Sequence, residues 1–168
     1  PDVFACAISI VGPSTLEKFM PHWNVDMMSM TLGGDPRTEE WLKFLASRSP
    51  VNFAHQTKIP ALVVQGAEDA RVPQAQSDII VEKMQKTGTD ITYLLYPDEG
   101  HGIVKPHNTK SLGGISEQFL ANCLGGRAEP IGNKLEGSTL QVPIGADNVK
   151  GLAEILEKIQ KIKLYRFI

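Results

Sequence analysis

The sequence lacks a long apolar run, an excess of charge of either sign and any metal-type spacing of histidine or cysteine. No stretch approaches the roughly 20 apolar residues that a membrane-spanning helix requires. The 17 basic and 19 acidic residues nearly cancel, leaving a net charge of −2. Nothing therefore favours a nucleic-acid-binding surface, and we expect neither nucleic acid nor membrane as a partner. The four histidines form no HxxxH or HExxH pattern, so we expect no metal and no other cofactor.

Cysteine is also scarce. Cys6 and Cys123 lie far apart in the chain, and both have apolar neighbours. A free thiol in such surroundings behaves as a small hydrophobic side chain. We therefore expect two free cysteines, with a disulfide as the less favoured alternative.

The remaining composition is that of an ordinary globular domain. The chain has 168 residues, of which 42% are hydrophobic and 21% are charged. This length suits a single domain with a modest core. The first residue is Pro1, and the apolar opening segment lacks the basic leader of a signal peptide. We expect a buried strand there, in a processed product or a piece of a longer protein.

Apolar runs and helical periodicity alternate along the chain. Short runs rich in β-branched residues predict buried strands over residues 5–11, 61–65 and 91–96. Apolar residues at helical spacing predict helices over residues 39–46, 74–87 and 116–124. Strands that alternate with helices over short connections are typical of a parallel α/β sheet.

The C-terminal part has a different character. Residues 125–145 are rich in glycine and proline, and we expect an extended excursion without regular structure. Asp147 can cap a final helix that has an apolar stripe on one face and charges of both signs on the other. Because the chain has acids beside the stripe, we expect a packing helix rather than a membrane-surface helix.

Two polar residues follow neighbouring predicted strands. Asp69 lies in QGAEDARVP, after residues 61–65, and His101 lies in YPDEGHGIVKP, after residues 91–96. A single loop aspartate is more often a helix cap, and a single loop histidine is more often simply solvated. Groups at the carboxyl ends of adjacent parallel strands share one rim of the sheet, so we expect these side chains to meet. An aspartate that is hydrogen-bonded to a histidine fixes the tautomer of the imidazole ring. In α/β hydrolases the acid comes before the histidine in the chain, which is the order of Asp69 and His101 here.

Three segments resemble the C-terminal catalytic domain of the prolyl oligopeptidase family of serine peptidases. They are SIVGPSTL, the run from SPVNFAHQ to DEGHGIVKP, and LGGRAEPIG. The nearer likeness is to the bacterial acylaminoacyl-peptidase and dipeptidyl-peptidase-like branch. The resemblance implies a partial α/β-hydrolase fold, built from the C-terminal strands and helices of a parallel sheet. Residues 1–151 would form the C-terminal portion of the peptidase domain, and residues 152–168 a C-terminal amphipathic helix or tail.

The resemblance also implies roles for three residues. Asp69 corresponds to the triad acid, His101 to the triad base, and Arg71 to an arginine that binds a backbone carbonyl of the substrate peptide. The fixed donors of a guanidinium suit that task, because they hold an oxygen acceptor in one orientation. The alternative for Arg71 is a surface ion pair with Glu68 or Asp98. These two carboxylates, together with Glu99, receive no assigned role.

The nucleophile of the family has no counterpart in the sequence. The attacking serine lies in a G-x-S-x-G turn, and none of the serines here has that setting. Ser14 and Ser116 each have the upstream glycine but lack the downstream one. The resemblance implies that this turn precedes the segment that matches Pro1, so we expect no appreciable hydrolysis by this chain alone. We also expect an apolar sheet edge that pairs with another copy, as a homo-oligomer, or with the missing N-terminal half.

The leading interpretation is therefore part of a serine-type peptidase whose intact enzyme hydrolyses oligopeptide or acyl-aminoacyl substrates. Two alternatives stay open. An esterase- or lipase-like α/β hydrolase would use the same Asp69 and His101, and a non-catalytic self-associating module would need neither. The sequence indicates neither the cleavage-site preference nor the cellular location.

Overall fold

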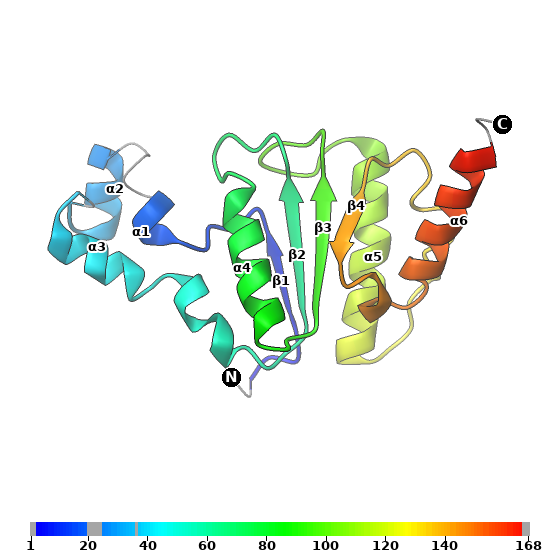
Figure 1. Ribbon diagram of the computed structural model, residues 1–168, viewed down its shortest axis with the longest axis horizontal. Coiled ribbons are helices and arrows are strands. Elements are labelled where there is room, and N and C mark those ends of the chain that lie inside the picture. Colours follow the sequence, from blue (N-terminus) through cyan, green and yellow to red (C-terminus); the bar gives the residue numbers. More distant parts are fainter. Residues whose placement is uncertain (1–2, 20–24, 36, 166–168) are drawn as a thin grey trace.

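The computed structural model describes residues 3–19, 25–35 and 37–165. One sheet has the strand order β1-β2-β3-β4. Its strands are β1 (Ala7–Ile10), β2 (Ala61–Gly66), β3 (Ile91–Tyr96) and β4 (Gln141–Ile144). The first three strands pair in parallel, and β4 runs antiparallel to β3 (Figure 1). This is the predicted α/β sheet with one antiparallel strand added.

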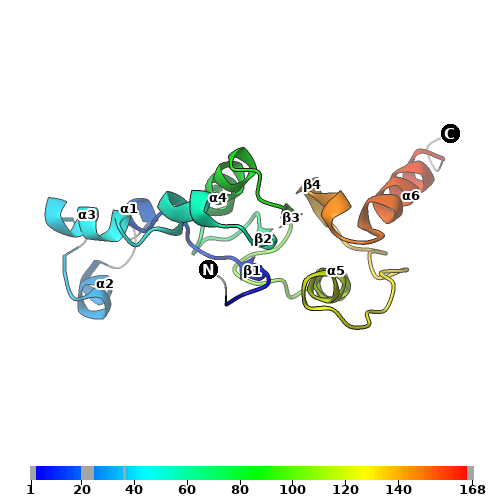
Figure 2. The same cartoon turned by 90° about the horizontal axis from the view of Figure 1, so that it is seen from below.

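Helices cover both faces of the sheet. Figure 2 shows α4 on one face and α5 on the other, with α1 to α3 beyond the β1 edge and α6 beyond β4. The helices are α1 (Leu16–Phe19), α2 (Val25–Leu32), α3 (Glu39–Ala46), α4 (Ala75–Lys86), α5 (Pro106–Leu124) and α6 (Leu152–Tyr165). The 3₁₀ turns η2 (Pro50–Gln56) and η3 (Ala146–Asn148) lie between them. Residues 166–168, which end the predicted C-terminal helix or tail, lie outside the described residues.

The central strands divide their side chains between two apolar clusters. Successive side chains of a strand point to opposite faces of the sheet. Leu62 and Leu94 therefore pack in the same cluster as Ile115 of α5, whereas Val63 packs with the α4 face. Every residue of β2 is buried, as expected for a parallel strand covered on both faces.

The first strand is more exposed than the sequence predicts. β1 forms as expected within residues 5–11, but most of its residues are exposed, and Ile10 keeps 47% of its accessible surface. Among the described residues, no strand pairs with the outer edge of β1. The prediction of a fully buried strand is therefore wrong for this chain, because an edge strand lacks cover on that side.

Helix α5 begins ten residues before the predicted start. Pro106 occupies its first turn, where a residue without an N–H is well tolerated. The helix contains Gly113 and Gly114, and glycine weakens a helix, which is why the sequence pattern predicts a later start. Gly114, however, has a packing role. A Cβ atom at Gly114 would lie only 2.6 Å from Cδ of Lys134, so the missing side chain makes room for the loop that follows α5.

Strand β4 lies inside the segment expected to be irregular. Tyr93 pairs with Ile144 and Leu95 with Gln141 across the β3–β4 ladder. β4 is an edge strand among the described residues, which is where a strand tolerates a proline such as Pro143. The glycine and proline content of residues 125–145 hid this strand from the sequence pattern.

The predicted apolar stripe of the final helix packs along most of its length. Leu152 is fully buried in the cluster that α5 shares with the sheet, and Ile155, Leu156 and Ile159 pack partly buried against it, whereas Ile162 is 56% exposed. The division of the chain at residue 151 stays a prediction.

Cys6 and Cys123 form a disulfide, so the expectation of free thiols is wrong. Their Cα atoms lie 6.1 Å apart, within the range that a disulfide spans. Both residues pack against the apolar cluster on the α5 face, which brings the end of α5 next to the start of β1. The sequence separation of 117 residues concealed this proximity.

We expect replacement of both cysteines by alanine to lower the free energy of unfolding by about 2–5 kcal/mol, because the bond restricts the unfolded chain. Urea unfolding with and without a reductant measures the change. The parent chain should lose stability on reduction, and the Cys6→Ala/Cys123→Ala variant should not respond to the reductant. Equal stability of the oxidised and reduced parent chains would contradict the prediction.

Candidate active site

Asp69 and His101 meet at the rim where β2 and β3 end. Both loops leave the same end of the sheet (Figure 1). Nδ1 of His101 lies 2.9 Å from Oδ2 of Asp69. The Asp69 side chain is fully buried, and that of His101 is 35% exposed. In the described part of the chain, Nε2 of His101 has no hydrogen-bond partner, so one ring nitrogen holds the acid while the other stays available.

Backbone donors hold the Asp69 carboxylate. Its Oδ1 accepts the N–H groups of Arg71 and Val72, both at 2.8 Å. Burial of the carboxyl raises its pKa, but the hydrogen bonds from Val72, His101 and Arg71 together outweigh burial, so the pKa of Asp69 lies below its usual value. Asp69 is therefore an ionised, fixed acceptor for the imidazole.

The glycine that follows His101 shapes the turn that carries the histidine. The N–H of Gly102 donates to the carbonyl of Gly100 at 2.9 Å, which closes a three-residue turn with His101 at its centre. Gly102 has a φ of 147°, a conformation that side-chain-bearing residues avoid. The turn projects the histidine from the end of β3, which explains why a glycine must follow it.

The two loops are also joined by their backbones. The N–H of Ala67 donates to the carbonyl of Tyr96 at 3.0 Å, and the N–H of Glu68 donates to the carbonyl of Glu99 at 2.9 Å. A Cβ atom at Gly66 would lie 2.3 Å from the carbonyl oxygen of Gly100, so only glycine allows this approach. The distance between the acid and the histidine therefore rests on main-chain contacts.

Arg71 lies beside the pair. Its side chain is exposed. Within the described residues it forms no ion pair, so the surface pairs with Glu68 or Asp98 that the sequence left open are not observed. Its N–H donates to Asp69, but its guanidinium is free to bind another group.

Sequence reasoning missed the residues that hold the His101 loop. Asp98 accepts hydrogen bonds from Lys105 at 2.6 Å and from Asn108 at 3.1 Å, and also from Thr139. The Lys105 ammonium is the main reason that the pKa of Asp98 falls to about 2. Glu99 is buried, and its carboxylate accepts hydrogen bonds from the N–H groups of Val104 and Lys105, which lead into α5. The acidic pair Asp98 and Glu99, directly before the G-H-G motif, is the sequence feature that could have indicated this support.

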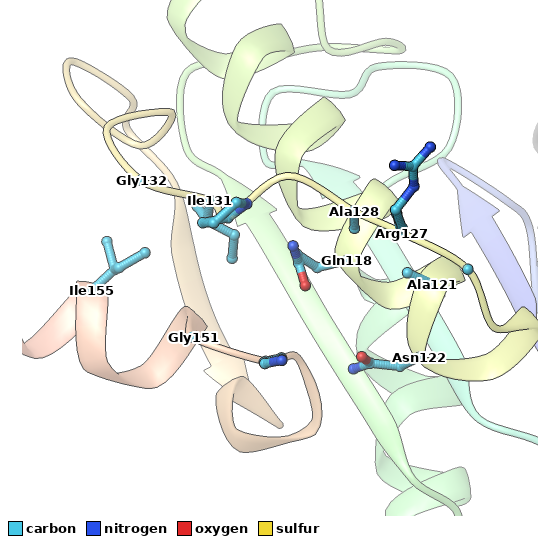
Figure 3. A pocket seen from close by; sticks show the side chains of 12 residues that line it. Gln118, Ala121, Asn122, Arg127, Ala128, Ile131, Gly132, Gly151 and Ile155 are labelled. Carbon is cyan, nitrogen blue, oxygen red and sulfur yellow. The ribbon is translucent and has the colours of Figure 1, made fainter.

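The described residues contain another hollow that does not belong to this rim. A cavity of about 510 Å³ lies between the C-terminal half of α5, residues 126–132 and the start of α6 (Figure 3). Gln118 points into it from α5. None of the residues that the sequence singled out for chemistry lines this cavity.

Neither a metal-type cluster of side chains nor a membrane-spanning helix occurs in the described part of the chain. No group of three or more histidine, cysteine, aspartate or glutamate side chains is arranged to hold a metal ion there. No helix there combines the length and apolar character needed to cross a bilayer.

Comparison with known sequences identifies the family. The model of the prolyl oligopeptidase family matches residues 1–127. The chain belongs to the prolyl oligopeptidase family. It is 50% identical over 163 residues to dipeptidyl aminopeptidase BIII of Pseudoxanthomonas mexicana, a match that covers 94% of this chain and 24% of that protein. It is 44% identical over 138 residues to dipeptidyl peptidase family member 6 of Caenorhabditis elegans, covering 78% of this chain and 18% of that protein.

Solved structures confirm the predicted α/β-hydrolase fold. A puromycin-hydrolyzing peptidase of Mycobacterium tuberculosis superposes with a TM-score of 0.67 at 29% identity, covering 77% of this chain and 21% of that one. An acylaminoacyl peptidase of Pyrococcus horikoshii gives a TM-score of 0.65 at 20% identity, covering 81% and 23%. The chain thus spans about a quarter or less of the length of these prolyl oligopeptidase family relatives.

The lowered pKa of Asp69 makes the stability of the folded chain depend on pH. A carboxylate whose pKa is lower in the folded state adds stability that is complete above its usual value of 3.8 and is lost as the pH falls through the folded value. We therefore expect Asp69→Asn to be less stable than the parent chain at neutral pH and the difference to shrink in acid. Urea unfolding over a pH series measures it.

Asp147→Asn is the control for this series. Asp147 is exposed, and its carboxylate has no hydrogen bond in the described part of the chain. We expect this variant to unfold like the parent chain at each pH. A stability gap for Asp69→Asn that is independent of pH would contradict the role given to the ionised carboxylate.

Proposed function

We propose that this chain supplies the acid and the histidine base of a serine peptidase, and that the attacking serine comes from a segment outside it. The observation that carries the proposal is the 2.9 Å contact between Nδ1 of His101 and the buried carboxylate of Asp69. Membership of the prolyl oligopeptidase family supports it, because the family consists of serine peptidases. The chain contains no G-x-S-x-G turn, so we expect it to be inactive by itself.

The geometry assigns each ring nitrogen a task. The Nδ1–H group donates a hydrogen bond to Asp69, so Nε2 of the neutral ring carries the lone pair. Nε2 takes the proton of the serine hydroxyl as its oxygen attacks the peptide carbonyl, and Asp69 stabilises the imidazolium that forms. The proton then passes to the leaving amine as the C–N bond breaks. A water molecule, activated by the same histidine, hydrolyses the acyl-serine.

We propose peptides as the substrate class. Relatives carry the names dipeptidyl aminopeptidase and dipeptidyl peptidase, and a structure more distant in sequence is an acylaminoacyl peptidase. The unpaired guanidinium of Arg71 lies two residues from the acid and can donate to a carbonyl of a bound peptide. An esterase would have less use for such a donor.

The test uses the complete gene product. We expect His101→Ala and Asp69→Asn each to lower kcat for a dipeptidyl p-nitroanilide by roughly 10⁴-fold, because the base is lost or is left in the wrong tautomer. Glu68→Gln is the matched control, since Glu68 is an exposed carboxylate beside Asp69, and its rate should stay near that of the parent. Parent-like rates in the His101 and Asp69 variants would contradict the proposal, and faster turnover of p-nitrophenyl esters would favour an esterase.

We further propose that the outer edge of β1 pairs with a strand from outside this chain. Three apolar side chains are exposed beside or on this strand: Val3, Phe4 and Ile10. Unpaired backbone groups next to apolar side chains form a template for another strand. In the isolated chain the occupant would be a second copy, and in the complete gene product it would be a neighbouring strand.

Light scattering tests the pairing of β1. We expect the isolated chain to self-associate and Ile10→Lys to weaken that association, because a charge on an edge strand opposes pairing. Met30→Lys, which replaces an exposed side chain on α2, should leave the association unchanged. A stable monomer of the parent chain would contradict the proposal.

A further inference from the structure

Glu99 is a buried carboxylate that the triad does not use. It lies two residues before His101, and only 2% of its surface is accessible. Oε1 accepts the N–H of Lys105 at 2.9 Å, and Oε2 accepts the N–H of Val104 at 3.2 Å. One side chain therefore connects the residues before and after His101 and closes the loop around it.

The same carboxylate serves the start of α5. The first N–H groups of a helix lack partners within the helix and carry a partial positive charge. Lys105, which precedes the first turn of α5, makes no capping hydrogen bond with its side chain. Glu99 places an anionic acceptor just before this turn, where it binds the N–H groups of Val104 and Lys105, so the His101 loop is held against the helix that follows it.

Asn108 completes the support of Glu99. It is buried, and its Nδ2 donates to Oε1 of Glu99 at 2.9 Å. Its Oδ1 accepts hydrogen bonds from the hydroxyl of Ser138 at 2.9 Å and from the N–H of Thr139 at 3.0 Å. The loop that carries the histidine is thereby tied to the segment that leads into β4.

The backbone of Glu99 faces the acid. Its carbonyl accepts the N–H of Glu68, the residue before Asp69, at 2.9 Å. Glu99 is thus the point at which the Asp69 loop, the His101 turn and the start of α5 are joined. Its carboxylate needs all of its donors, because an unpaired buried charge is strongly unfavourable.

We propose that Glu99 is a positioning residue that keeps the His101 ring in contact with Asp69. This inference rests on the proposed function for its catalytic consequence but not for its structural one. Loss of the carboxylate would free the residues that follow His101 and allow the imidazole to move away from the acid. A displacement of about 1 Å in a reacting group can cost about 100-fold in rate.

The first measurement uses this chain and requires no activity. The low-field NMR signal of a proton held between Nδ1 of His101 and the Asp69 carboxylate reports the contact. We expect Glu99→Ala to weaken this signal and Asp69→Asn to abolish it. Glu99→Gln keeps the shape of the side chain and its contacts with Lys105 and Asn108, so its signal should stay closer to that of the parent chain. Glu117→Gln is the matched control, since Glu117 is a hydrogen-bonded carboxylate on α5 away from the loop.

A double-mutant cycle on the kcat of the complete gene product separates positioning from a direct charge effect of Glu99. If Glu99 acts through the contact between Asp69 and His101, Glu99→Ala should lower kcat little further in an Asp69→Asn background. A loss that persists in full in that background would overturn the proposal. A parent-like low-field signal in Glu99→Ala would also overturn it.

The second measurement uses the complete gene product. We expect Glu99→Ala to lower kcat by about 10- to 100-fold with little change in KM, and Glu99→Gln to recover much of the rate. A rise in KM with an unchanged kcat would overturn the proposed positioning role. If the low-field signal of His101 responds as expected but the complete gene product cleaves no peptide, the role of Glu99 is supported and the proposed peptidase function fails.

Discussion

The register between β2 and β3 is the constraint on which the site depends. These parallel strands pair residue by residue from Ala61 opposite Ile91 to Gly66 opposite Tyr96, so both end at the same level of the sheet. The loops that follow start side by side and exchange backbone hydrogen bonds at once. A one-residue slip would turn every side chain of a strand to the opposite face and would also separate Asp69 from His101. The core and the catalytic pair therefore require the same alignment.

Two buried carboxylates are stabilised by the same physical means. Asp69 is bound by the N–H groups of Arg71 and Val72, and Glu99 by those of Val104 and Lys105. Backbone donors cannot rotate away, so they fix the position of a carboxylate as well as its charge. Asp69 then offers an oxygen to the imidazole, whereas Glu99 uses its oxygens to hold the loop.

Local sequence patterns were sufficient for the central part of the fold. The apolar runs of β2 and β3 and the periodicity of α3 and α4 predict these elements to within one or two residues. The order of Asp69 and His101, each after its own strand, predicts that the two side chains meet. Their distance and their backbone donors required the three-dimensional structure, because the donors belong to a turn whose shape the sequence does not specify.

The errors arose where distant contacts override local pattern. The disulfide joins residues 117 positions apart, and only the packing of α5 against the sheet brings Cys6 near Cys123. Gly114 weakened the helix prediction, although its lack of a side chain admits Lys134. Pro143 suggested a loop but lies in a strand that has β3 on one side only. The exposure of β1 depends on what lies beside the sheet, which its own residues cannot specify.

The most direct test of the account is NMR of this chain with ¹⁵N-labelled histidine. A proton held between Nδ1 of His101 and the Asp69 carboxylate should give a protected low-field signal, coupled to the His101 ring. We predict that this signal is present in the parent chain and in Glu68→Gln and is absent in Asp69→Asn. No such signal in the parent chain, or an unchanged one in Asp69→Asn, would contradict the claim that the two residues meet across neighbouring strand ends.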